Sequence, residues 1–498
     1  MSSFWVWQQQ VSGASANLKP GTSNPKPQTR NFKPNTDNKM FPSGFISSIR
    51  HAAGFDVDSF LNAHETADPP VSIRINPMKN GDSREKLFEG MEKVPWSFYG
   101  YYLPERPVFT LDPLLHAGAY YVQEASSMFL EQAVKEVCKK ITLNHVLDLC
   151  AAPGGKSTHL LSLLPEETVL VSNEVIHART SVLLENITKW GTCRSIVTQN
   201  DPADFGKLGP TFDLMVVDAP CSGSGLFRRD AGVMKEWSEQ AVELCSQRQQ
   251  RILADAIPAL KPGGYLLYAT CSYSPDEDEK ILDWLASGFA MEGVSLNWPD
   301  RKEGVVAAHS PQENIPCYRF YPGRVKGEGF FMALLKKGGD DEYLLKRASK
   351  QKTVAEKLPD AMRSWVKAPD FFQFYRHKEN IYLMPPAVWQ AFQQWRQHLN
   401  IRKAGVKMAE DAHGKFNPSH DLALCPELQM DSFPLYSADK STALSFLRKE
   451  DFALASGTPK GWILMSFQGN PLGWIKNIGN RSNNYYPREW RIRMQGGC

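Results

Sequence analysis

The stretch that decides the fold is Val146-Leu147-Asp148-Leu149-Cys150-Ala151-Ala152-Pro153-Gly154-Gly155-Lys156-Ser157-Thr158. A short apolar run ends here in an acid, a loop of small residues follows, and an apolar helical pattern begins near residue 157. A strand, a glycine-containing loop and a helix form the first unit of a nucleotide-binding sheet. Glycine lets the backbone approach a ligand, and the start of the helix offers free N–H groups to an anion.

Two common nucleotide-binding motifs are excluded in this loop. A phosphate-binding loop requires G-x-x-x-x-G-K-[ST], but Cys150 stands where its first glycine would be. The dinucleotide pattern G-x-G-x-x-G is also absent. The loop therefore suits S-adenosylmethionine, whose carboxylate would lie at the start of the helix. The predicted cofactor contacts in this loop are Ala151, Ala152, Pro153, Gly154, Gly155, Lys156 and Ser157.

The composition is that of a globular protein, with 42% hydrophobic and 22% charged residues among 498, which predicts two to four domains. No apolar run is long enough to span a membrane, and no signal peptide is visible. The nine cysteines are scattered and form no C-x-x-C pair. This pattern favours a reducing, cytoplasmic location and argues against a disulfide framework or structural zinc. We therefore expect no membrane association, no metal and a monomer.

The positive charge is concentrated at the N-terminus. Residues 1–39 hold five basic side chains and one acidic one, so the rest of the chain, at a total of +3, is almost neutral. These residues are rich in Ser, Asn, Gln and Pro, which predicts a disordered basic tail. Folded patterning begins at Met40. Nucleic-acid binding by the folded part must therefore depend on local basic patches.

Strand and helix patterns alternate from the loop to about residue 337, which predicts a largely parallel sheet with helices on both faces. The strand 168–174 ends in Glu174, at a distance from the loop where an acid can accept both ribose hydroxyls. A solvated acid at a helix start is the alternative. Arg179 follows in the next helix, and the strand 195–201 ends in Asp201, which suits the adenine amine. We expect Glu174, Arg179, Asp201 and also Asp218 to contact the cofactor.

Two later strands each deliver a cysteine at the carboxyl end. The strand 212–218 leads into Asp218-Ala219-Pro220-Cys221, and the strand 265–274 contains Thr270-Cys271-Ser272. If these strands are neighbours in the sheet, both thiols flank one cleft beside the cofactor. Two buried, inert cysteines are the alternative.

The segments on either side of this sheet carry weaker signals. Residues 71–77 alternate like a half-buried strand, on which Arg74 is either an RNA contact or an ordinary surface side chain. Residues 118–128 form a packing element next to the cofactor site. Residues 440–498 hold nine basic and three acidic side chains, and a hairpin is expected around 469–471. Near the end Arg491 and Arg493 alternate with apolar residues, which suits phosphate contacts.

Taken together, the motifs resemble the Sun/Fmu (Nop2/Sun-like) family of RNA cytosine-C5 methyltransferases, over residues 70–337. The segments that carry the resemblance are Arg74-Ile75-Asn76, Val122-Gln123-Glu124-Ala125-Ser126, Ala152-Pro153-Gly154-Gly155-Lys156, Asp218-Ala219-Pro220-Cys221 and Thr270-Cys271-Ser272. The C-terminal part is similar to the pseudouridine-synthase-and-archaeosine-transglycosylase-like (PUA-like) RNA module of bacterial small-subunit rRNA enzymes of the F type. Residues 1–39 have no counterpart there.

The resemblance implies an α/β protein: a Rossmann-like class I methyltransferase domain with a small N-terminal α/β domain and a C-terminal β-rich PUA-like RNA-binding module. The expected divisions are a tail at 1–39, an N-terminal RNA-binding subdomain at 40–112, the S-adenosylmethionine-dependent domain at 113–337, a linker at 338–368, an intermediate module at 369–432 and the PUA-like domain at 433–498.

The resemblance also implies the chemistry. Cys271 is the nucleophile that adds to cytosine C6, Asp218 holds the ring at N3, and Cys221 assists release. Only a thiolate attacks, so positive charge from Lys156 or the cofactor sulfonium is expected to lower the pKa of the nucleophile. DNA cytosine enzymes use the Cys of a Pro-Cys motif, which keeps Cys221 as the rival nucleophile.

Other function classes are less consistent with these motifs. An amino-methylating enzyme would carry Asn/Asp-Pro-Pro-aromatic after the fourth strand, where this chain has Asp218-Ala219-Pro220-Cys221. A non-catalytic RNA-binding protein would not need both thiols and the cofactor loop. The expected partner is RNA, with small-subunit (16S) rRNA, free or within the assembled small ribosomal subunit, as the leading substrate and tRNA as the alternative.

Overall fold

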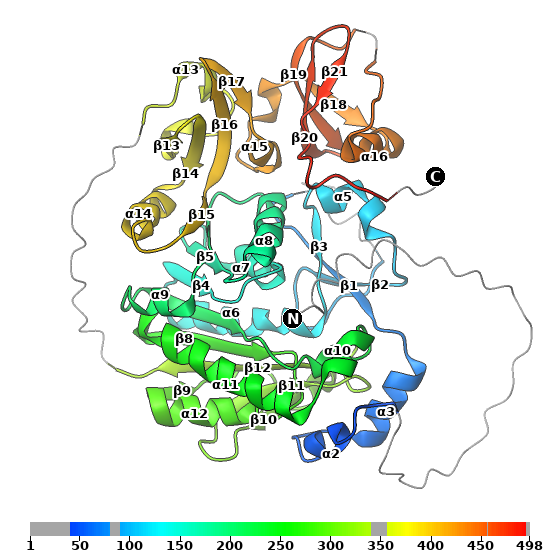
Figure 1. The fold of residues 1–498 in the computed structure, drawn as a ribbon, viewed down its shortest axis with the longest axis vertical. Helices are drawn as coiled ribbons and strands as arrows, with labels where there is room; N and C mark the ends of the chain where they lie inside the picture. The colour runs from blue at the N-terminus through cyan, green and yellow to red at the C-terminus, as the bar shows by residue number, and fades with distance from the viewer. Residues whose placement is uncertain (1–39, 80–89, 340–355, 456, 495–498) are drawn as a thin grey trace, which may run out of the picture.

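The computed structural model describes residues 40–79, 90–339, 356–455 and 457–494. The predicted tail 1–39 lies outside the described residues, as does the part 340–355 of the predicted linker. The methyltransferase-like sheet occupies the centre of an elongated molecule, and the C-terminal strands lie at one end of it (Figure 1). Among the described helices, none has the length and apolar character that a membrane span requires.

A 10-stranded mixed sheet forms the centre of the molecule, in the order β10-β11-β12-β8-β7-β4-β5-β6-β15, with β9 paired to β12. Its parallel part consists of β4 (His145–Asp148), β5 (Val169–Asn173), β6 (Ser195–Thr198), β7 (Phe212–Asp218) and β8 (Leu260–Thr270). Its antiparallel strands are β9 (Met291–Gly293), β10 (Val306–His309), β11 (Pro316–Phe320), β12 (Phe330–Lys337) and β15 (Ile401–Ala404). The prediction of parallel strands is confirmed for β4 to β8, whereas β9 to β12, within the same predicted range, are antiparallel.

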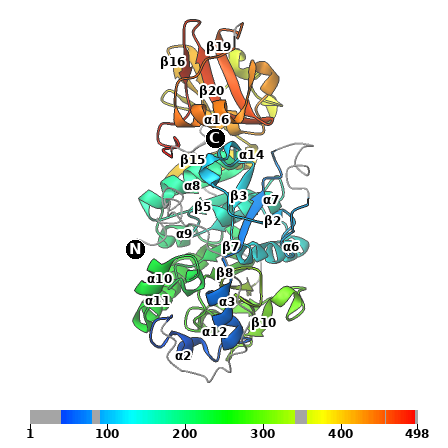
Figure 2. The same cartoon turned by 90° about the vertical axis from the view of Figure 1, so that its right-hand side faces the viewer.

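The sheet is covered on both faces because successive side chains of a strand point in opposite directions. Val146 and Leu170 pack in one core cluster, whereas Leu147 and Val171 pack in another. The helices of the first cluster are α6 (Leu130–Lys140), α7 (Gly155–Leu163) and α8 (His177–Trp190). Those of the second are α9 (Pro202–Gly206), α11 (Glu239–Ala256), α12 (Glu279–Phe289) and α14 (Pro386–Trp395). Figure 2 shows α6 and α9 on opposite sides of the central strands.

The strand order fixes where a ligand can bind. β4 pairs with β5 on one side and with β7 on the other, so the chain connections leave β4 in opposite directions. In open α/β sheets such a switch point leaves a crevice outside the carboxyl ends of the strands. The loop 149–154 follows β4 directly and therefore lies at this crevice.

The N-terminal part forms a separate antiparallel sheet. Its elements are α2 (Phe45–Ile49), α3 (Val57–Thr66), β1 (Val71–Ile75), β2 (Gly100–Leu103), α5 (Pro113–His116) and β3 (Tyr120–Val122). The strands lie in the order β2-β1-β3. Because β3 pairs with β1, this sheet extends to residue 122, past the boundary that the sequence suggested at 112. β1 is the central strand, and its two faces are covered by different parts of the chain.

The region 369–432 is less independent than a separate module would be. It contains its own sheet of β13 (Gln373–His377), β14 (Asn380–Met384), β16 (Val406–Ala412) and β17 (Lys415–Pro418). However, β15 from the same region pairs antiparallel with β6, and Trp389 and Trp395 of α14 join the core of the central sheet. The remaining short helices here are α13 (Asp360–Arg363) and α15 (His420–Leu424).

The C-terminal module, residues 433–494, contains β18 (Leu435–Ala438), α16 (Lys440–Arg448), β19 (Gly461–Phe467), β20 (Asn470–Asn477) and β21 (Ser482–Asn484). The predicted hairpin is confirmed as β19 and β20, with its turn at Gln468 and Gly469, which both have positive φ. Ile73 of β1 packs in one cluster with Phe446 and Ile463. The C-terminal module therefore shares a core with the N-terminal sheet.

One charged cluster is buried inside the central layer, next to the strand that carries Cys271. Arg319 of β11 donates from Nε to Glu279 (2.6 Å) and lies 3.2 Å from Asp278, and all three side chains are buried. Asp278 in turn accepts a hydrogen bond from the Thr270 hydroxyl (2.6 Å). Burial raises the pKa of Asp278 well above its ordinary value. Arg319 therefore keeps two carboxylates stable inside the protein and fixes the backbone beside Cys271.

Replacing Arg319 by Met should leave the buried carboxylates of Asp278 and Glu279 without a positive partner. This loss lowers the free energy of unfolding by about 3 kcal/mol when both are charged. Burial holds the pKa of Asp278 above its unfolded value, so the cost is present at high pH and falls as the carboxylates take up protons. The drop in thermal midpoint should therefore be larger at pH 8 than at pH 5. Arg301→Met, at an exposed position, is the control. An equal drop at both pH values would contradict this account.

Candidate active site

A cavity of about 170 Å³ lies at the carboxyl ends of the central strands. The cavity is lined together by Lys156 from the first turn of α7, Asp218 at the end of β7 and Cys271 after β8. The opposite wall comes from β3 and the residues that follow it, from Tyr121 to Glu124. This confirms the prediction that residues 118–128 pack next to the cofactor loop.

The two thiols meet at this cavity. β7 and β8 pair in parallel, with Asp218 opposite Ala269, so the cysteine segments leave the sheet side by side. The Sγ atoms of Cys221 and Cys271 are 3.1 Å apart. Of these two described residues, Cys271 lines the cavity and Cys221 does not. The hydrogen bond with Cys271, followed by burial, raises the pKa of Cys221 well above its ordinary value. The two strands are neighbours and their thiols are in contact, as predicted, but only Cys271 lines the cavity.

Lys156 and Asp218 form an ion pair in the cavity wall, with 2.7 Å between Nζ and Oδ2. Burial alone would lower the pKa of Lys156, but the charge and hydrogen bond of Asp218 outweigh it, so the net shift is upward. The negative form of Cys271 also contributes to this upward shift. A fixed positive charge therefore lies where it can stabilise a thiolate.

The loop after β4 is shaped for an anion. Gly154 is the N-cap of α7 with φ 112°, a left-handed conformation that favours glycine. The loop is held in place by α8, since Arg179 Nη2 donates to the Ala152 carbonyl (2.7 Å) and Asn186 Nδ2 to the Pro153 carbonyl (2.8 Å). The N–H groups in the first turn of α7 have no partner within the helix and can bind a carboxylate.

Asp148, the last residue of β4, has a carboxylate oxygen that can bind a positive group of a cofactor. Its Oδ2 accepts a hydrogen bond from the Ser157 hydroxyl (2.6 Å), whereas its Oδ1 is buried and has no hydrogen-bond partner among the described residues. Burial raises the pKa of Asp148 to about 7. A bound ammonium group would satisfy the free oxygen and favour the charged form.

The remaining predicted cofactor residues lie around this loop. Glu174 follows β5 and is buried, which excludes the alternative of a solvated acid. Its Oε1 accepts from the Ile176 N–H (2.9 Å), and its Oε2 lies 3.4 Å from Arg179. Asp201 caps α9 through the Ala203 N–H (3.1 Å). The predicted residues that line the cavity are Ala151, Ala152, Pro153, Gly155, Lys156, Asp218 and Cys271, and those outside its lining are Gly154, Ser157, Glu174, Arg179, Asp201 and Cys221.

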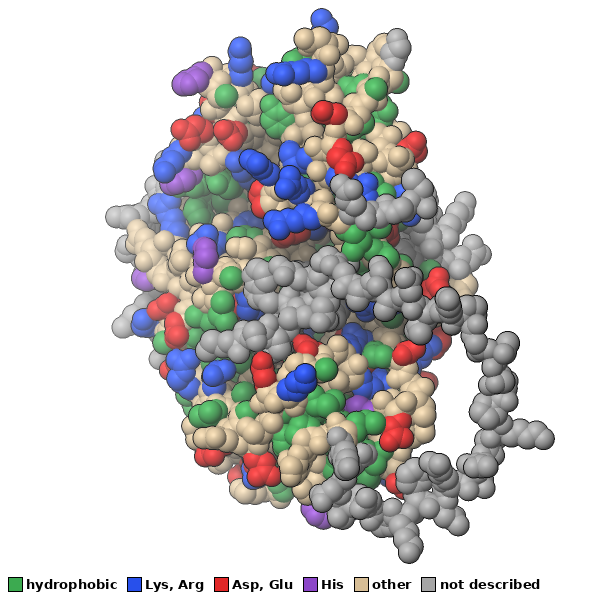
Figure 3. Space-filling view, turned by 45° about the vertical axis from the view of Figure 1, so that its right-hand side comes forward, with side chains coloured by type: hydrophobic (Ala, Val, Ile, Leu, Met, Phe, Trp, Pro, Cys, Tyr) green, Lys and Arg blue, Asp and Glu red, His purple; other side chains and the backbone are tan. Residues whose placement is uncertain are grey.

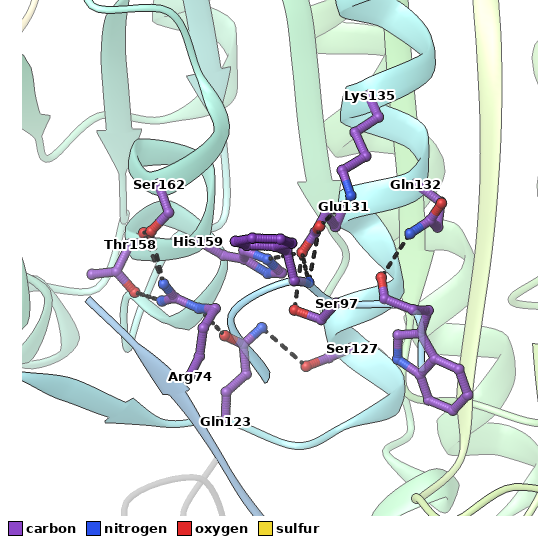
Figure 4. A network of polar contacts seen from close by, with 12 residues as sticks. Arg74, Ser97, Gln123, Ser127, Glu131, Gln132, Lys135, Thr158, His159 and Ser162 are labelled. Carbon is purple, nitrogen blue, oxygen red and sulfur yellow. Dashed lines mark hydrogen bonds and ion pairs between the residues drawn. The ribbon is translucent and has the colours of Figure 1, made fainter. Parts of the chain in front are cut away.

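Both interpretations of Arg74, an RNA contact and a surface side chain, are wrong. Arg74 is completely buried and packs over the ring of Trp190 (4.4 Å). Its guanidinium donates to Gln123 Oε1 (2.8 Å) and to Thr158 Oγ1 (2.5 Å). Figure 4 shows this network between β1 and α7, which continues to the buried pair of His159 and Glu131. Arg74 therefore attaches the N-terminal sheet to the helix that carries the cofactor loop.

Glu277 is a residue of this site that the sequence did not single out. One carboxylate oxygen accepts from the Ser222 N–H (2.7 Å), and the other accepts from the hydroxyls of Ser222 (2.5 Å) and Ser272 (2.6 Å). Ser222 follows Cys221, and Ser272 follows Cys271, so this carboxylate joins the two cysteine loops. Gly225 also permits a close approach, because a Cβ there would lie 2.8 Å from the Cys271 carbonyl oxygen.

A parallel sheet with the cofactor loop after β4, an acid after β5 and antiparallel strands beyond β8 defines a class I methyltransferase fold. Three sequence-family models agree with this class. They are described as 16S rRNA methyltransferase RsmB/F, matched by residues 139–336, the N-terminal domain of 16S rRNA methyltransferase RsmF, matched by 41–125, and the methyltransferase RsmF PUA domain, matched by 433–492. All three models describe RsmB/F or RsmF methyltransferases, and together their matches cover most of the chain.

Relatives with the same arrangement cover almost the whole chain. The ribosomal RNA small subunit methyltransferase F of Shewanella piezotolerans is 28% identical over 477 residues, which is 90% of this chain and 97% of the relative. The protein of the same name from Pectobacterium atrosepticum is 29% identical over 477 residues, 90% of this chain and 95% of the relative. The crystal structure of PH0851 has a TM-score of 0.52 and 25% identity, and covers 61% of this chain and 70% of its own.

Replacing Glu277 by Gln should slow methyl transfer about tenfold, because hydrogen bonds to a charged acceptor contribute about 1.5 kcal/mol. An amide nitrogen in place of the oxygen that accepts from both serine hydroxyls cannot accept either hydrogen bond. The two cysteine loops then lose their shared partner. The cofactor loop is unaffected, so cofactor affinity measured by calorimetry should stay constant while kcat falls. Asp276→Asn, at the exposed neighbour, is the control. Unchanged kcat in Glu277→Gln would exclude this role.

Proposed function

We propose that this protein transfers a methyl group from S-adenosylmethionine to C5 of a cytosine in small-subunit rRNA, through a covalent bond between Cys271 and C6 of the base. The observation that carries the proposal is the cavity in which the Cys271 thiol lies with the Lys156–Asp218 pair, while Cys221 contacts Cys271 from behind. An enzyme that methylates an exocyclic amine or an oxygen needs no thiol at this place.

The residues after β4 and β5 fit S-adenosylmethionine. Its carboxylate would bind the first-turn N–H groups of α7, and its ammonium group would bind the free Oδ1 of Asp148. Glu174 would accept the ribose hydroxyls, and Asp201 after β6 would lie towards the adenine. When bound, the cofactor supplies an electrophilic methyl group on a sulfonium.

The thiol pair supplies the nucleophile. Cytosine C5 is a poor nucleophile, so a thiolate must first add to C6 and make C5 electron-rich. The hydrogen bond with Cys271 and burial raise the pKa of Cys221. Cys221 therefore keeps its proton and can donate a hydrogen bond to the Cys271 sulfur. The positive charge of Lys156 adds to this stabilisation. Cys271 thus attacks C6 and the electron pair of the C5=C6 bond moves towards N3, where Asp218 supplies the proton or hydrogen bond that stabilises the adduct.

The second half of the reaction restores the base. After C5 has taken the methyl group, the C5 proton passes to a base, which water can supply. The C–H electron pair re-forms the C5=C6 double bond, and the S–C6 bond breaks with its electron pair leaving on the Cys271 sulfur. Cys221 lies 3.1 Å from the sulfur that departs, so it is placed to assist this elimination. Only Cys271 of the pair lines the cavity, which favours Cys271 over Cys221 as the nucleophile.

RNA as the substrate is supported by the relatives and by the C-terminal module. Two relatives that are similar over nearly the whole chain are named as methyltransferases of small-subunit ribosomal RNA. Residues 433–492 match the PUA domain of the same group. The target base must leave its stack to enter a cavity at the end of the sheet.

Replacing Glu174 by Ala should weaken S-adenosylmethionine binding about tenfold to hundredfold, because a charged acceptor for two hydroxyls is lost. Calorimetry without RNA measures this affinity directly. Glu167→Ala, at an exposed acid before β5, should bind like the wild type. Wild-type affinity in Glu174→Ala would remove Glu174 from the cofactor site.

The roles of the two thiols can be distinguished by trapping the covalent adduct between protein and RNA. Cys271→Ala cannot form the bond to C6 and should lose turnover, whereas Cys221→Ala can attack but not eliminate and should remain joined to its RNA. On a denaturing gel with labelled RNA, Cys221→Ala should give a slow, protease-sensitive band that Cys271→Ala and the double variant lack. Cys138→Ala, at an exposed cysteine, should behave like the wild type. A band from Cys271→Ala and none from Cys221→Ala would reverse the two roles.

A further inference from the structure

A second cavity of about 210 Å³ adjoins the active-site cavity. Tyr121 and Val122 of β3 line both, so the two cavities share a wall. The far side of the second cavity is formed by α8, from Glu185 to Trp190. A ligand that extends from the active site past Tyr121 and Val122 of β3 therefore enters this second cavity.

Polar groups without partners lie in its walls. The Tyr121 hydroxyl and the Trp190 Nε1–H are buried and have no hydrogen-bond partner within the described part of the chain. Buried polar groups are almost always satisfied, by protein, water or a ligand. Both side chains are at least nine-tenths buried, and both belong to the lining. These groups are therefore suited to a polar ligand that offers acceptors.

Arg106 adds an unpaired cation at the same cavity. It packs over the ring of Phe109 (5.7 Å), and no described carboxylate forms an ion pair with it. Partial burial, followed by the positive charge of Arg229, lowers the pKa of Arg106. Arg229 lines the active-site cavity. Arg229 is paired with Glu328 (3.3 Å), so Arg106, and not Arg229, remains available to pair with an anion.

The same cavity leads to the C-terminal module. Lys189 lies over the ring of Trp490 (5.7 Å), and His116 contacts the Tyr486 hydroxyl (3.4 Å). Beyond Trp490, Arg491 and Arg493 are exposed while Ile492 is buried, as the alternation in sequence predicts. Lys and Arg side chains gather in the upper part of the face in Figure 3, where the C-terminal module lies.

We propose that the second cavity binds a nucleotide of the RNA strand that flanks the target cytidine, with Arg106 on its phosphate and the Tyr121 and Trp190 polar groups on its base or ribose. This inference rests on RNA being the substrate. The cavity then lies between the target site and the basic segment of the C-terminal module, and it sets the direction in which the strand leaves the active site. Single-stranded RNA is bound in this way, by arginine at phosphates and by aromatic side chains at bases.

The test compares Arg106→Ala, Arg106→Lys and Tyr121→Phe with the wild type, using a small-subunit rRNA transcript. Arg106→Ala should raise the Kd for the transcript about tenfold and make its salt dependence shallower by about 0.7 in the log–log slope, which is the loss of one phosphate contact with a single strand. Arg106→Lys should restore the slope. Tyr121→Phe should raise the Kd with the slope unchanged, since only a neutral hydroxyl is lost.

Arg50→Ala is the matched control, because Arg50 is exposed at the end of α2, far from the C-terminal module (Figure 1). It should bind RNA like the wild type, and the two Arg106 variants should bind S-adenosylmethionine normally. If the wild type methylates the transcript while Arg106→Ala keeps both its Kd and its salt slope, the cavity is no nucleotide site and the proposed function stands. If the wild type methylates no RNA, the proposed function and this inference both fail.

Discussion

Parallel pairing of β7 with β8 is the constraint on which the site depends. The register places Asp218 opposite Ala269, so the segments that carry Cys221 and Cys271 leave neighbouring strands at the same edge. Their sulfur atoms then lie 3.1 Å apart. The same edge receives the loop after β4, which brings Lys156 to Asp218. Strand order alone therefore assembles the reactive groups from distant parts of the sequence.

Buried polar residues hold this arrangement in place. A buried charge is costly unless its hydrogen-bonding capacity is used, and both Glu277 and Arg74 meet that condition with several partners. Glu277 connects the two cysteine loops, and Arg74 connects the N-terminal sheet to α7. Groups that are already oriented need no rearrangement when charge develops on the substrate. The N-terminal sheet is thus part of the structural support of the cofactor site.

Much of the fold could be predicted because the strong signals are local. The strands at 146–149 and 212–218, the cofactor loop and the hairpin near 470 follow from apolar runs and glycine turns, and all lie where the sequence places them. Arg74 could not be predicted, since the polar face of β1 looks exposed until α7 covers it. Glu277 lies within four consecutive acids, which resemble a solvated surface run. In both cases the deciding contact comes from a residue far away in the sequence.

The central claim is that Cys271 forms a covalent bond with C6 of a cytosine in RNA. RNA that contains 5-fluorocytidine tests it most directly, because fluorine at C5 prevents proton loss and leaves the adduct in place. After incubation with the wild-type protein and S-adenosylmethionine, protease and nuclease digestion followed by mass spectrometry identifies the modified peptide. We expect a methylated fluorocytidine on the peptide that contains Cys271. An adduct on Cys221, or methylated nucleosides with the methyl group on N4 and no adduct, would contradict the account.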